Sequence, residues 1–345
     1  MHELQGRHVL VTGAAGFIGA NLVQALLRYG AEVHAIIRPN SNLWRIEKLL
    51  PDLYLHAVDI TDREGLKKIV LETSPEIIYH LAAQGVSPAF QERYEILRTN
   101  ILGTFNLLEA TAPLDYQLFV HLGGSSEYGA KHGPMRELDC PEPLTFYGTA
   151  KAAATLLCQQ HARANGRPVV ALRAFSVYGP WESPSRLIPT AIRAALGDHE
   201  LALTAAGFRR DFIFVEDLVE ACLLALRAVR ICTGEIINIG TGKQWSNEEV
   251  VDLIQAVTGR RIKVRVGAYP ARASDKAHWV ADIGKAGSLL GWEPRHPLRA
   301  GLEKTIAWFL LHQDDYDGLS QELPGPGARD AVSGPGSFAP LQTEV

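Results

Sequence analysis

The hydrophobic pattern alternates between short apolar runs and helical spacing through the first half of the chain. Short runs rich in β-branched residues predict buried strands, and apolar residues recurring three and four positions apart predict helices that cover them. The predicted strands are 8–13, 32–37, 53–60, 76–83, 117–124 and 168–175, and the predicted helices are 17–29, 64–73, 94–111 and 147–166. Strands that alternate with helices predict an α/β fold with a doubly wound parallel sheet.

The pattern becomes less regular after residue 176, where Pro-rich breaks separate shorter elements. Helical or strand-to-helix patterns occur at 189–196, 208–228, 247–259 and 281–292. These observations predict a sheet domain over 1–175, partly shared with later segments, and a smaller C-terminal lobe over 176–312. Residues 313–345 are rich in Gly, Pro and Ser, which predicts a disordered tail.

Composition narrows the protein class without naming an activity. The 345 residues are 47% hydrophobic and 21% charged, with a formal net charge of −4, as in ordinary globular proteins. This balance offers no basic patch for nucleic acid, and no apolar run reaches the ~20 residues of a membrane span. The N-terminus lacks a signal-peptide pattern. The four cysteines are expected to be free thiols in the cytoplasm, and the histidines show no metal-ligand spacing.

A glycine-rich loop lies between the first predicted strand and the first predicted helix. Gly13, Gly16 and Gly19 would allow the backbone to approach a pyrophosphate, while the helix N-terminus supplies oriented N–H groups. The position of the loop favours phosphate binding over an ordinary tight turn. We expect the cofactor-binding residues here to be Gly13, Ala15, Gly16, Phe17, Ile18 and Gly19.

Tyr147 and Lys151 lie four residues apart near the start of a predicted helix, so both side chains share one face. A phenol with its usual pKa of ~10 is a poor base at neutral pH. A nearby ammonium would lower that pKa; a shift of about 3 units requires about 4 kcal/mol. Tyr147 could then take a hydroxyl proton while hydride leaves the same carbon.

These motifs together resemble the extended short-chain dehydrogenase/reductase family over roughly residues 7–312. The resemblance is carried by TGAAGFIG at 12–19, Asp59-Ile60, Leu81-Ala82-Ala83 and the Tyr147/Lys151 pair. It implies a Rossmann-like domain that binds NAD or NADP, a lobe for a nucleoside-diphosphate sugar, and a homodimer. It also implies that Asp59 and Ile60 flank the adenine, that Leu81, Ala82 and Ala83 line the cofactor, and that Lys151 holds the nicotinamide ribose.

The end of the second predicted strand bears on the choice of cofactor. NAD-preferring folds place an acidic residue there, but this chain has Arg38 and no carboxylate. Arg38 could bond the 2′-phosphate of NADP, and the segment resembles the corresponding loop of GDP-mannose 4,6-dehydratases. We therefore expect NADP, with NAD as the alternative.

The segment Gly124-Ser125-Ser126-Glu127 departs from the pattern of the resembled family. Related enzymes usually place a catalytic hydroxyl where Gly124 stands, so we expect Ser125 to take this role, with Ser126 as the alternative. An acidic residue in this segment serves related dehydratases as the base and acid for water elimination. Glu127 could do this, or it could be a capping or salt-bridged residue.

Four residues of the lobe are candidate substrate ligands. Family members commonly carry Asn where Ser176 stands, whereas the sequence around Ser176 is closer to that of uronate 4-epimerases. Arg210 and Arg272 match basic positions that grip the sugar diphosphate, and the planar guanidinium suits phosphate oxygens. Arg186 is a further candidate, although each arginine could instead form a surface ion pair, such as Arg210 with Asp211.

Three functions fit the sequence, with a narrow preference for the first. One is redox-neutral epimerase or dehydratase chemistry through hydride transfer at hexose C4. The second is NADPH-dependent reduction of a nucleoside-diphosphate 4-keto-6-deoxyhexose. The third is a non-catalytic NAD(P)-binding sensor, which the presence of both Tyr147 and Lys151 disfavours.

Overall fold

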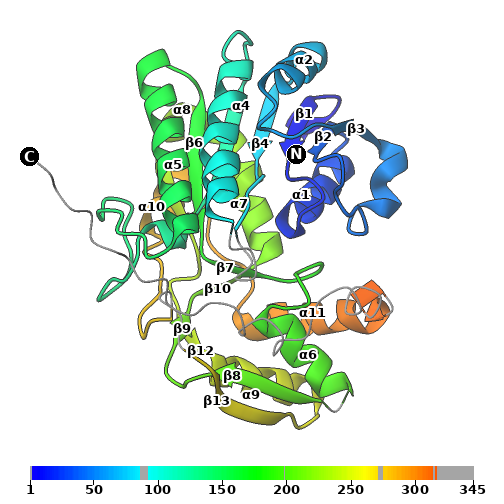
Figure 1. Ribbon diagram of the computed structural model, residues 1–345, viewed down its shortest axis with the longest axis vertical. Helices are drawn as coiled ribbons and strands as arrows, with labels where there is room; N and C mark the ends of the chain where they lie inside the picture. Colours follow the sequence, from blue (N-terminus) through cyan, green and yellow to red (C-terminus); the bar gives the residue numbers. More distant parts are fainter. Residues whose placement is uncertain (1, 86–91, 198, 271–274, 314, 317–345) are drawn as a thin grey trace, which may run out of the picture.

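A seven-stranded parallel sheet organises the upper half of the molecule in Figure 1. The structure is a computed structural model that describes residues 2–85, 92–197, 199–270, 275–313 and 315–316. The strand order is β11-β6-β5-β4-β1-β2-β3, and each neighbouring pair is parallel. The strands are β1 (His8–Thr12), β2 (Glu32–Ile37), β3 (Leu53–Ala57), β4 (Ile77–His80), β5 (Leu118–Gly124), β6 (Val169–Ala174) and β11 (Ile236–Ile239). The predicted doubly wound sheet is confirmed, and its strand order reverses between β1 and β4, where such sheets bind ligands.

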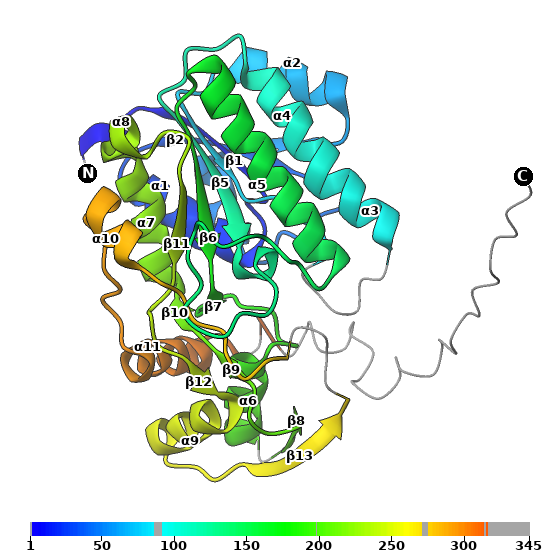
Figure 2. The same ribbon diagram turned by 90° about the vertical axis from the view of Figure 1, so that its left-hand side faces the viewer.

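Helices cover both faces of this sheet, giving the three layers visible in Figure 2. One layer contains α1 (Phe17–Arg28), α7 (Val215–Arg227), α8 (Val229–Cys232) and α10 (Gly284–Leu290). The other contains α2 (Arg63–Thr73), α3 (Arg93–Leu97), a π-helical turn η3 (Arg98–Leu102), α4 (Gly103–Thr111) and α5 (Phe146–Asn165). Each face of the sheet packs its own apolar cluster against these helices, as expected for strands buried on both sides.

The helix that carries Tyr147 and Lys151 has well-defined ends. Thr145 is the N-cap of α5, and its Oγ1 accepts a hydrogen bond of 3.0 Å from the amide of Gly148. Gly166 ends the helix with a φ of 62°, a left-handed conformation that glycine adopts without a Cβ penalty. These caps fix the first turn of α5 against the end of β5.

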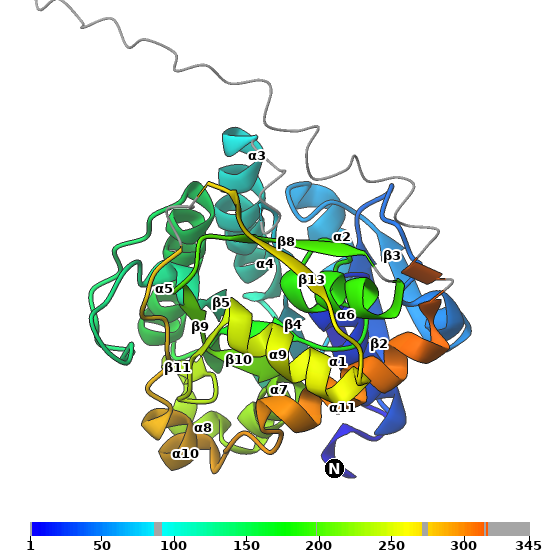
Figure 3. The same cartoon turned by 90° about the horizontal axis from the view of Figure 1, so that it is seen from below.

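The lower lobe has an apolar core of its own, and Figure 3 shows it from below. Its helices are α6 (Leu187–Gly197), α9 (Asn247–Thr258) and α11 (Leu298–Leu311). The later part of the chain also forms three two-stranded sheets: β7 (Ser176–Tyr178) with β10 (Phe212–Phe214), β9 (Arg209–Arg210) with β12 (Trp245–Ser246), and β8 (Glu200–Thr204) with β13 (Lys263–Tyr269), the last of which lies at the bottom of the lobe in Figure 1. Short 3₁₀ turns are η1 (His2–Leu4), η2 (Glu47–Asp52) and η4 (Ser125–Glu127).

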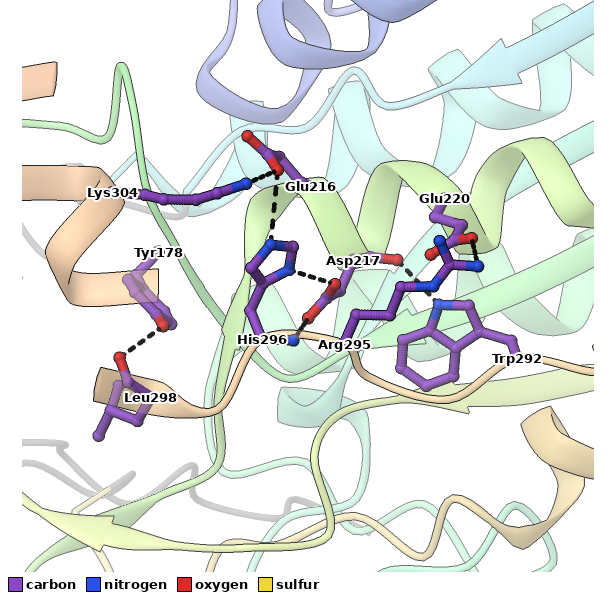
Figure 4. Close-up of polar contacts among 9 residues, drawn as sticks. All are labelled: Tyr178, Glu216, Asp217, Glu220, Trp292, Arg295, His296, Leu298 and Lys304. Atoms are coloured by element: carbon purple, nitrogen blue, oxygen red, sulfur yellow. Dashed lines mark hydrogen bonds and ion pairs between the residues drawn. The ribbon is translucent and has the colours of Figure 1, made fainter. Parts of the chain in front are cut away.

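The segment before α11 is anchored on the start of α7, as Figure 4 shows. The indole Nε1 of Trp292 donates to the carbonyl of Asp217 at 3.0 Å, and the carboxylate of Asp217 bonds both the ring Nδ1 and the amide of His296. The hydroxyl of Tyr178 donates to the carbonyl of Leu298 at 3.2 Å. The bonds to Asp217 join this segment to the helical layer of the sheet, whereas the bond of Tyr178 lies within the lobe.

β11, α7 and α10 return to the sheet from beyond residue 175, so later segments share the sheet domain. The structure differs from the predicted elements at two places. The predicted helix 94–111 is interrupted by η3, where Asn100 bonds the backbone of Gln84 through both ends of its amide. Tyr316 was assigned to a disordered tail, but its ring is buried against α11 and Trp44. The rest of that tail, from 317, lies outside the described residues.

Candidate active site

The glycine loop adopts a geometry that only glycine permits. Gly13 has a φ of 72°, and a Cβ there would lie 2.7 Å from the amide nitrogen of Ala82. A Cβ on Gly19 would lie 2.1 Å from the carbonyl oxygen of Gly13. Gly16 is the N-cap of α1 and provides no side-chain cap, so the first amides of α1 can receive an anion. This loop fits the pyrophosphate of a dinucleotide.

The other predicted cofactor residues lie at the same edge of the sheet. Arg38 follows β2, is exposed, and donates to the amide oxygen of Gln84 after β4 at 3.2 Å. Asp59 follows β3, and its Oδ1 accepts from both the amide and the hydroxyl of Thr61. Ile60 is buried, whereas Leu81 and Ala82 are half-buried and Ala83 is exposed. The ends of β1, β2, β3 and β4 thus border one surface beside the glycine loop.

A buried polar bridge, which the sequence analysis did not identify, holds β1 and β4 together at this edge. His80 bonds the hydroxyl of Thr12 through Nδ1 at 2.7 Å and that of Thr104 through Nε2 at 2.8 Å. His80 is therefore a core histidine with both ring nitrogens bonded. His121 differs, because its two buried ring nitrogens have no hydrogen-bond partner among the described residues.

Acidification is expected to destabilise the fold through His80. Burial, reinforced by the charge of Lys151, lowers the pKa of His80 to about 3. Histidine in the unfolded chain titrates near 6.5, so between these values the unfolded state binds a proton that folded His80 does not. As the pH falls through this window, the free energy of unfolding should therefore decrease, by up to ~1.4 kcal/mol per pH unit. Urea unfolding at several pH values should show a shallower loss for His80→Gln than for wild type, and equal slopes would contradict this.

Tyr147 and Lys151 lie in the first turns of α5, with Lys151 buried and Tyr147 half-buried. Burial lowers the pKa of Lys151 to about 8, while the Glu127 carboxylate opposes this shift. Burial also raises the pKa of Tyr147 to about 12, with a further increase from Glu127 and an opposing effect of Arg186. The predicted lowering of the Tyr147 pKa is therefore not found, because desolvation of the phenolate and the charge of Glu127 outweigh the opposing charge of Arg186.

Ser125 and Ser126 lie in η4, directly after β5, and differ in their contacts. Ser125 Oγ accepts a 2.9 Å hydrogen bond from the indole Nε1 of Trp279. Ser126 Oγ is buried and has no partner in the described part of the chain. Two hydroxyls therefore lie at the end of β5, the neighbour of β6 in the sheet.

Glu127 is engaged entirely by the protein. Its Oε2 accepts from Arg173 Nε at 2.7 Å, and both side chains are at most 1% exposed. Its Oε1 accepts from the amide of Gly124 at 2.8 Å and from the hydroxyl of Thr155 at 3.0 Å. Of the two interpretations left open, this geometry matches the capped and salt-bridged glutamate.

The predicted substrate residues are divided between two places in the lobe. Arg186 is close enough to Tyr147 to lower its pKa, and its Nε lies 3.7 Å from a carboxylate oxygen of Glu182. Arg210 lies over the ring of Trp279, with its Cζ 5.0 Å from the ring centroid, and bonds Asp275 at 3.1 Å. Ser176 begins β7 and is half-buried. Arg272 lies outside the described residues.

Asp211 does not form the surface ion pair that was considered for Arg210. Its carboxylate is buried and accepts from the amides of Thr241, Gly242 and Ala281 and from the hydroxyl of Thr241. Burial raises its pKa to about 6, which these bonds partly oppose. Asp211 therefore ties β9 to the segment that carries Trp279.

Comparison with known proteins adds independent evidence to this geometry. Residues 9–240 match the profile of the NAD dependent epimerase/dehydratase family. The chain belongs to that family. This agrees with the resemblance noted in the glycine loop and the Tyr147/Lys151 pair.

Members of the epimerase/dehydratase family with named activities cover nearly the whole chain. UDP-glucuronate 4-epimerase of Thermodesulfobacterium geofontis is 30% identical and spans 87% of this chain and 95% of its own length. dTDP-glucose 4,6-dehydratase of Neisseria gonorrhoeae is also 30% identical, over 88% of this chain and 96% of its own. The structure of UDP-glucuronic acid 4-epimerase from Bacillus cereus, with UDP-glucuronic acid and NAD, matches with a TM-score of 0.80, 31% identity, and coverage of 88% and 99%.

Among the described residues, no cluster of His, Cys, Asp and Glu side chains is arranged to hold a metal ion. No helix in the described ranges is long and apolar enough to cross a membrane.

Trp279 and Glu182 were missed by the sequence analysis, because nothing in their local sequence marks them as neighbours of Ser125 or Arg186.

Proposed function

We propose that this chain catalyses redox-neutral epimerisation at C4 of the sugar in a nucleoside-diphosphate sugar, with UDP-glucuronate as the first candidate. The observation that carries this proposal is the position of Glu127. Its carboxylate is bonded to Arg173, Thr155 and the amide of Gly124. The segment after β5 therefore has serine hydroxyls that can bond the substrate, but its carboxylate is not available as a base for water elimination. This favours epimerisation over dehydration.

The proposed chemistry assigns one task to each group at the end of β5 and the start of α5. A bound nicotinamide supplies the acceptor and donor of hydride for the sugar C4. Tyr147 exchanges the proton of the C4 oxygen, and the ammonium of Lys151 holds the nicotinamide ribose. Ser125 donates a hydrogen bond to the same sugar oxygen, and Ser126 is the alternative donor.

An anionic sugar is supported by the charge around Tyr147. Arg186 acts on the pKa of Tyr147, so its guanidinium is near the proposed reacting end of the sugar. Guanidinium groups bind carboxylates through paired hydrogen bonds. Two of the compared proteins are named for UDP-glucuronate. Arg210, and Arg272 beyond the described residues, are proposed to bind the diphosphate.

A substrate panel tests this proposal. Purified protein, with no cofactor added, is incubated with UDP-glucuronate, UDP-glucose or dTDP-glucose, and products are separated by ion-pair chromatography with mass detection. We expect an isomer of unchanged mass from UDP-glucuronate. A product lighter by one water would indicate a dehydratase, and turnover only of 4-ketosugars with added NADPH would indicate the reductase.

We infer that the cofactor is NADP, because Arg38 follows β2 and no carboxylate occupies the end of that strand. Arg38→Asp is expected to weaken NADP binding by roughly 10- to 100-fold, the value of a charge-assisted phosphate contact, and to favour NAD. Calorimetric titration of both cofactors measures this, with Arg28→Ala as the control, since Arg28 bonds Gln24 on α1. NAD as the cofactor released from denatured wild-type protein would contradict the inference.

A homodimer is supported by the outer helical layer of the sheet domain (Figure 2). Large apolar side chains are exposed on α3, η3, α4 and α5, namely Tyr94, Leu102, Phe105 and Leu156. A second copy of the chain could cover them by packing the same helices. Light scattering would distinguish the dimer from a monomer.

The four cysteines are free thiols, which supports the proposal that the protein resides in the cytoplasm.

A further inference from the structure

Ser125 and Trp279 are 154 residues apart in the sequence, and their side chains are in contact. Ser125 lies in η4 at the end of β5, and Trp279 lies in the segment between β13 and α10. Their side chains join through the 2.9 Å bond from indole Nε1 to hydroxyl Oγ. Trp279 is 5% exposed and packs with Tyr128, Met135 and Phe175. The contact is therefore protected from water.

The direction of this bond decides what the hydroxyl of Ser125 can do. An indole N–H is a donor only, so the contact occupies a lone pair of Ser125 Oγ and leaves the hydroxyl hydrogen for another acceptor. Within the described residues, no acceptor for that hydrogen is found. This donor without an acceptor lies in η4, which packs against the first turn of α5 at Gly148, and it suits a substrate oxygen that gains negative charge as its proton leaves.

Trp279 is itself held in place from several sides. Its backbone amide donates to the side-chain oxygen of Gln244 at 2.9 Å, and the guanidinium of Arg210 lies over its ring. A cation over the ring draws π-electron density toward itself and so strengthens the N–H as a donor. The indole plane, and with it the rotamer of Ser125, is fixed before substrate arrives.

We propose that Trp279 is a positioning residue that makes Ser125 a dedicated hydrogen-bond donor to the reacting sugar oxygen. This inference rests on the proposed reaction at C4. It also accounts for the displacement of the hydroxyl by one residue relative to related enzymes. Gly124 has room for a side chain, since a Cβ there would meet nothing closer than 3.7 Å, so Ser125 serves because Trp279 orients it.

Trp279→Phe tests the proposal, since it keeps an aromatic side chain under Arg210 and removes the N–H donor. We expect kcat to fall about tenfold, with KM and bound cofactor unchanged. The matched control is Trp292→Phe, which removes the buried indole bond to the carbonyl of Asp217 (Figure 4) and should leave kcat unchanged. The assay uses whichever nucleotide sugar of the panel wild type converts.

The same substitution is then made in Ser125→Ala. If Trp279 acts through Ser125, Trp279→Phe causes no further loss of kcat in that background. An equal fold-loss in both backgrounds, an unchanged kcat in wild-type background, or a rise in KM alone would overturn the proposal. A wild type that converts no nucleotide sugar would overturn the proposed function, whereas active wild type with additive variants would overturn only the role of Trp279.

Discussion

Tyr147→Phe is expected to reduce turnover of UDP-glucuronate by at least ~100-fold, the usual loss when a positioned proton-transfer group is removed. The substitution deletes one oxygen from a half-buried side chain at the start of α5. Folding and cofactor content should therefore stay at wild-type levels. Initial rates and the absorbance of bound cofactor measure both effects in one preparation.

Tyr178→Phe is the matched control for this experiment. Its phenol bonds the carbonyl of Leu298 inside the lobe (Figure 4), so its loss should affect stability by about 1 kcal/mol and leave turnover intact. Full activity of Tyr147→Phe would remove the proton-transfer step from the proposed mechanism.

Glu127→Gln is expected to destabilise the protein by about 3–5 kcal/mol, because it leaves the buried guanidinium of Arg173 without a counter-charge. Arg173 is 1% exposed and also stacks on Tyr128, so it cannot turn toward water without disrupting that packing. The free energy of unfolding in urea measures the effect. Glu142→Gln, which breaks an exposed pair with Lys131, should cost at most ~1 kcal/mol.

The activity of Glu127→Gln separates the two roles considered for this residue. If the carboxylate supports the fold, the variant still interconverts the C4 epimers at temperatures where it remains folded. If Glu127 were an acid and base for elimination, the folded variant would accumulate a 4-ketosugar with reduced cofactor. That second outcome would restore the dehydratase interpretation.

Local pattern was sufficient for the elements that build the cofactor site. The apolar run of β1 and the helical spacing of α1 place the glycine loop between them, and spacing alone placed Tyr147 and Lys151 on one face of α5. β11 was missed because its four buried residues include Asn238, whose amide bonds Tyr128 and Met135. α11 was also missed, although Leu298, Leu302, Ile306 and Phe309 repeat at helical spacing.

The site's detailed chemistry depended on contacts that spacing does not encode. Whether Glu127 faces substrate or Arg173 is decided by Arg173 in the next strand of the sheet, 46 residues later. The rotamer of Ser125 depends on Trp279, which no local motif connects to η4. The pKa of Tyr147 was predicted with the wrong sign because the burial of α5 against the sheet could not be weighed from the sequence.

The most direct test of the central claim uses UDP-glucuronate labelled with deuterium at C4, with no added cofactor. Proton NMR would follow the sugar until the two C4 epimers reach equilibrium. The account predicts that deuterium stays on C4 of both epimers and that no reduced cofactor accumulates, because the same hydride leaves and returns. Loss of the label from C4 to solvent, or conversion that requires stoichiometric NADPH, would contradict it.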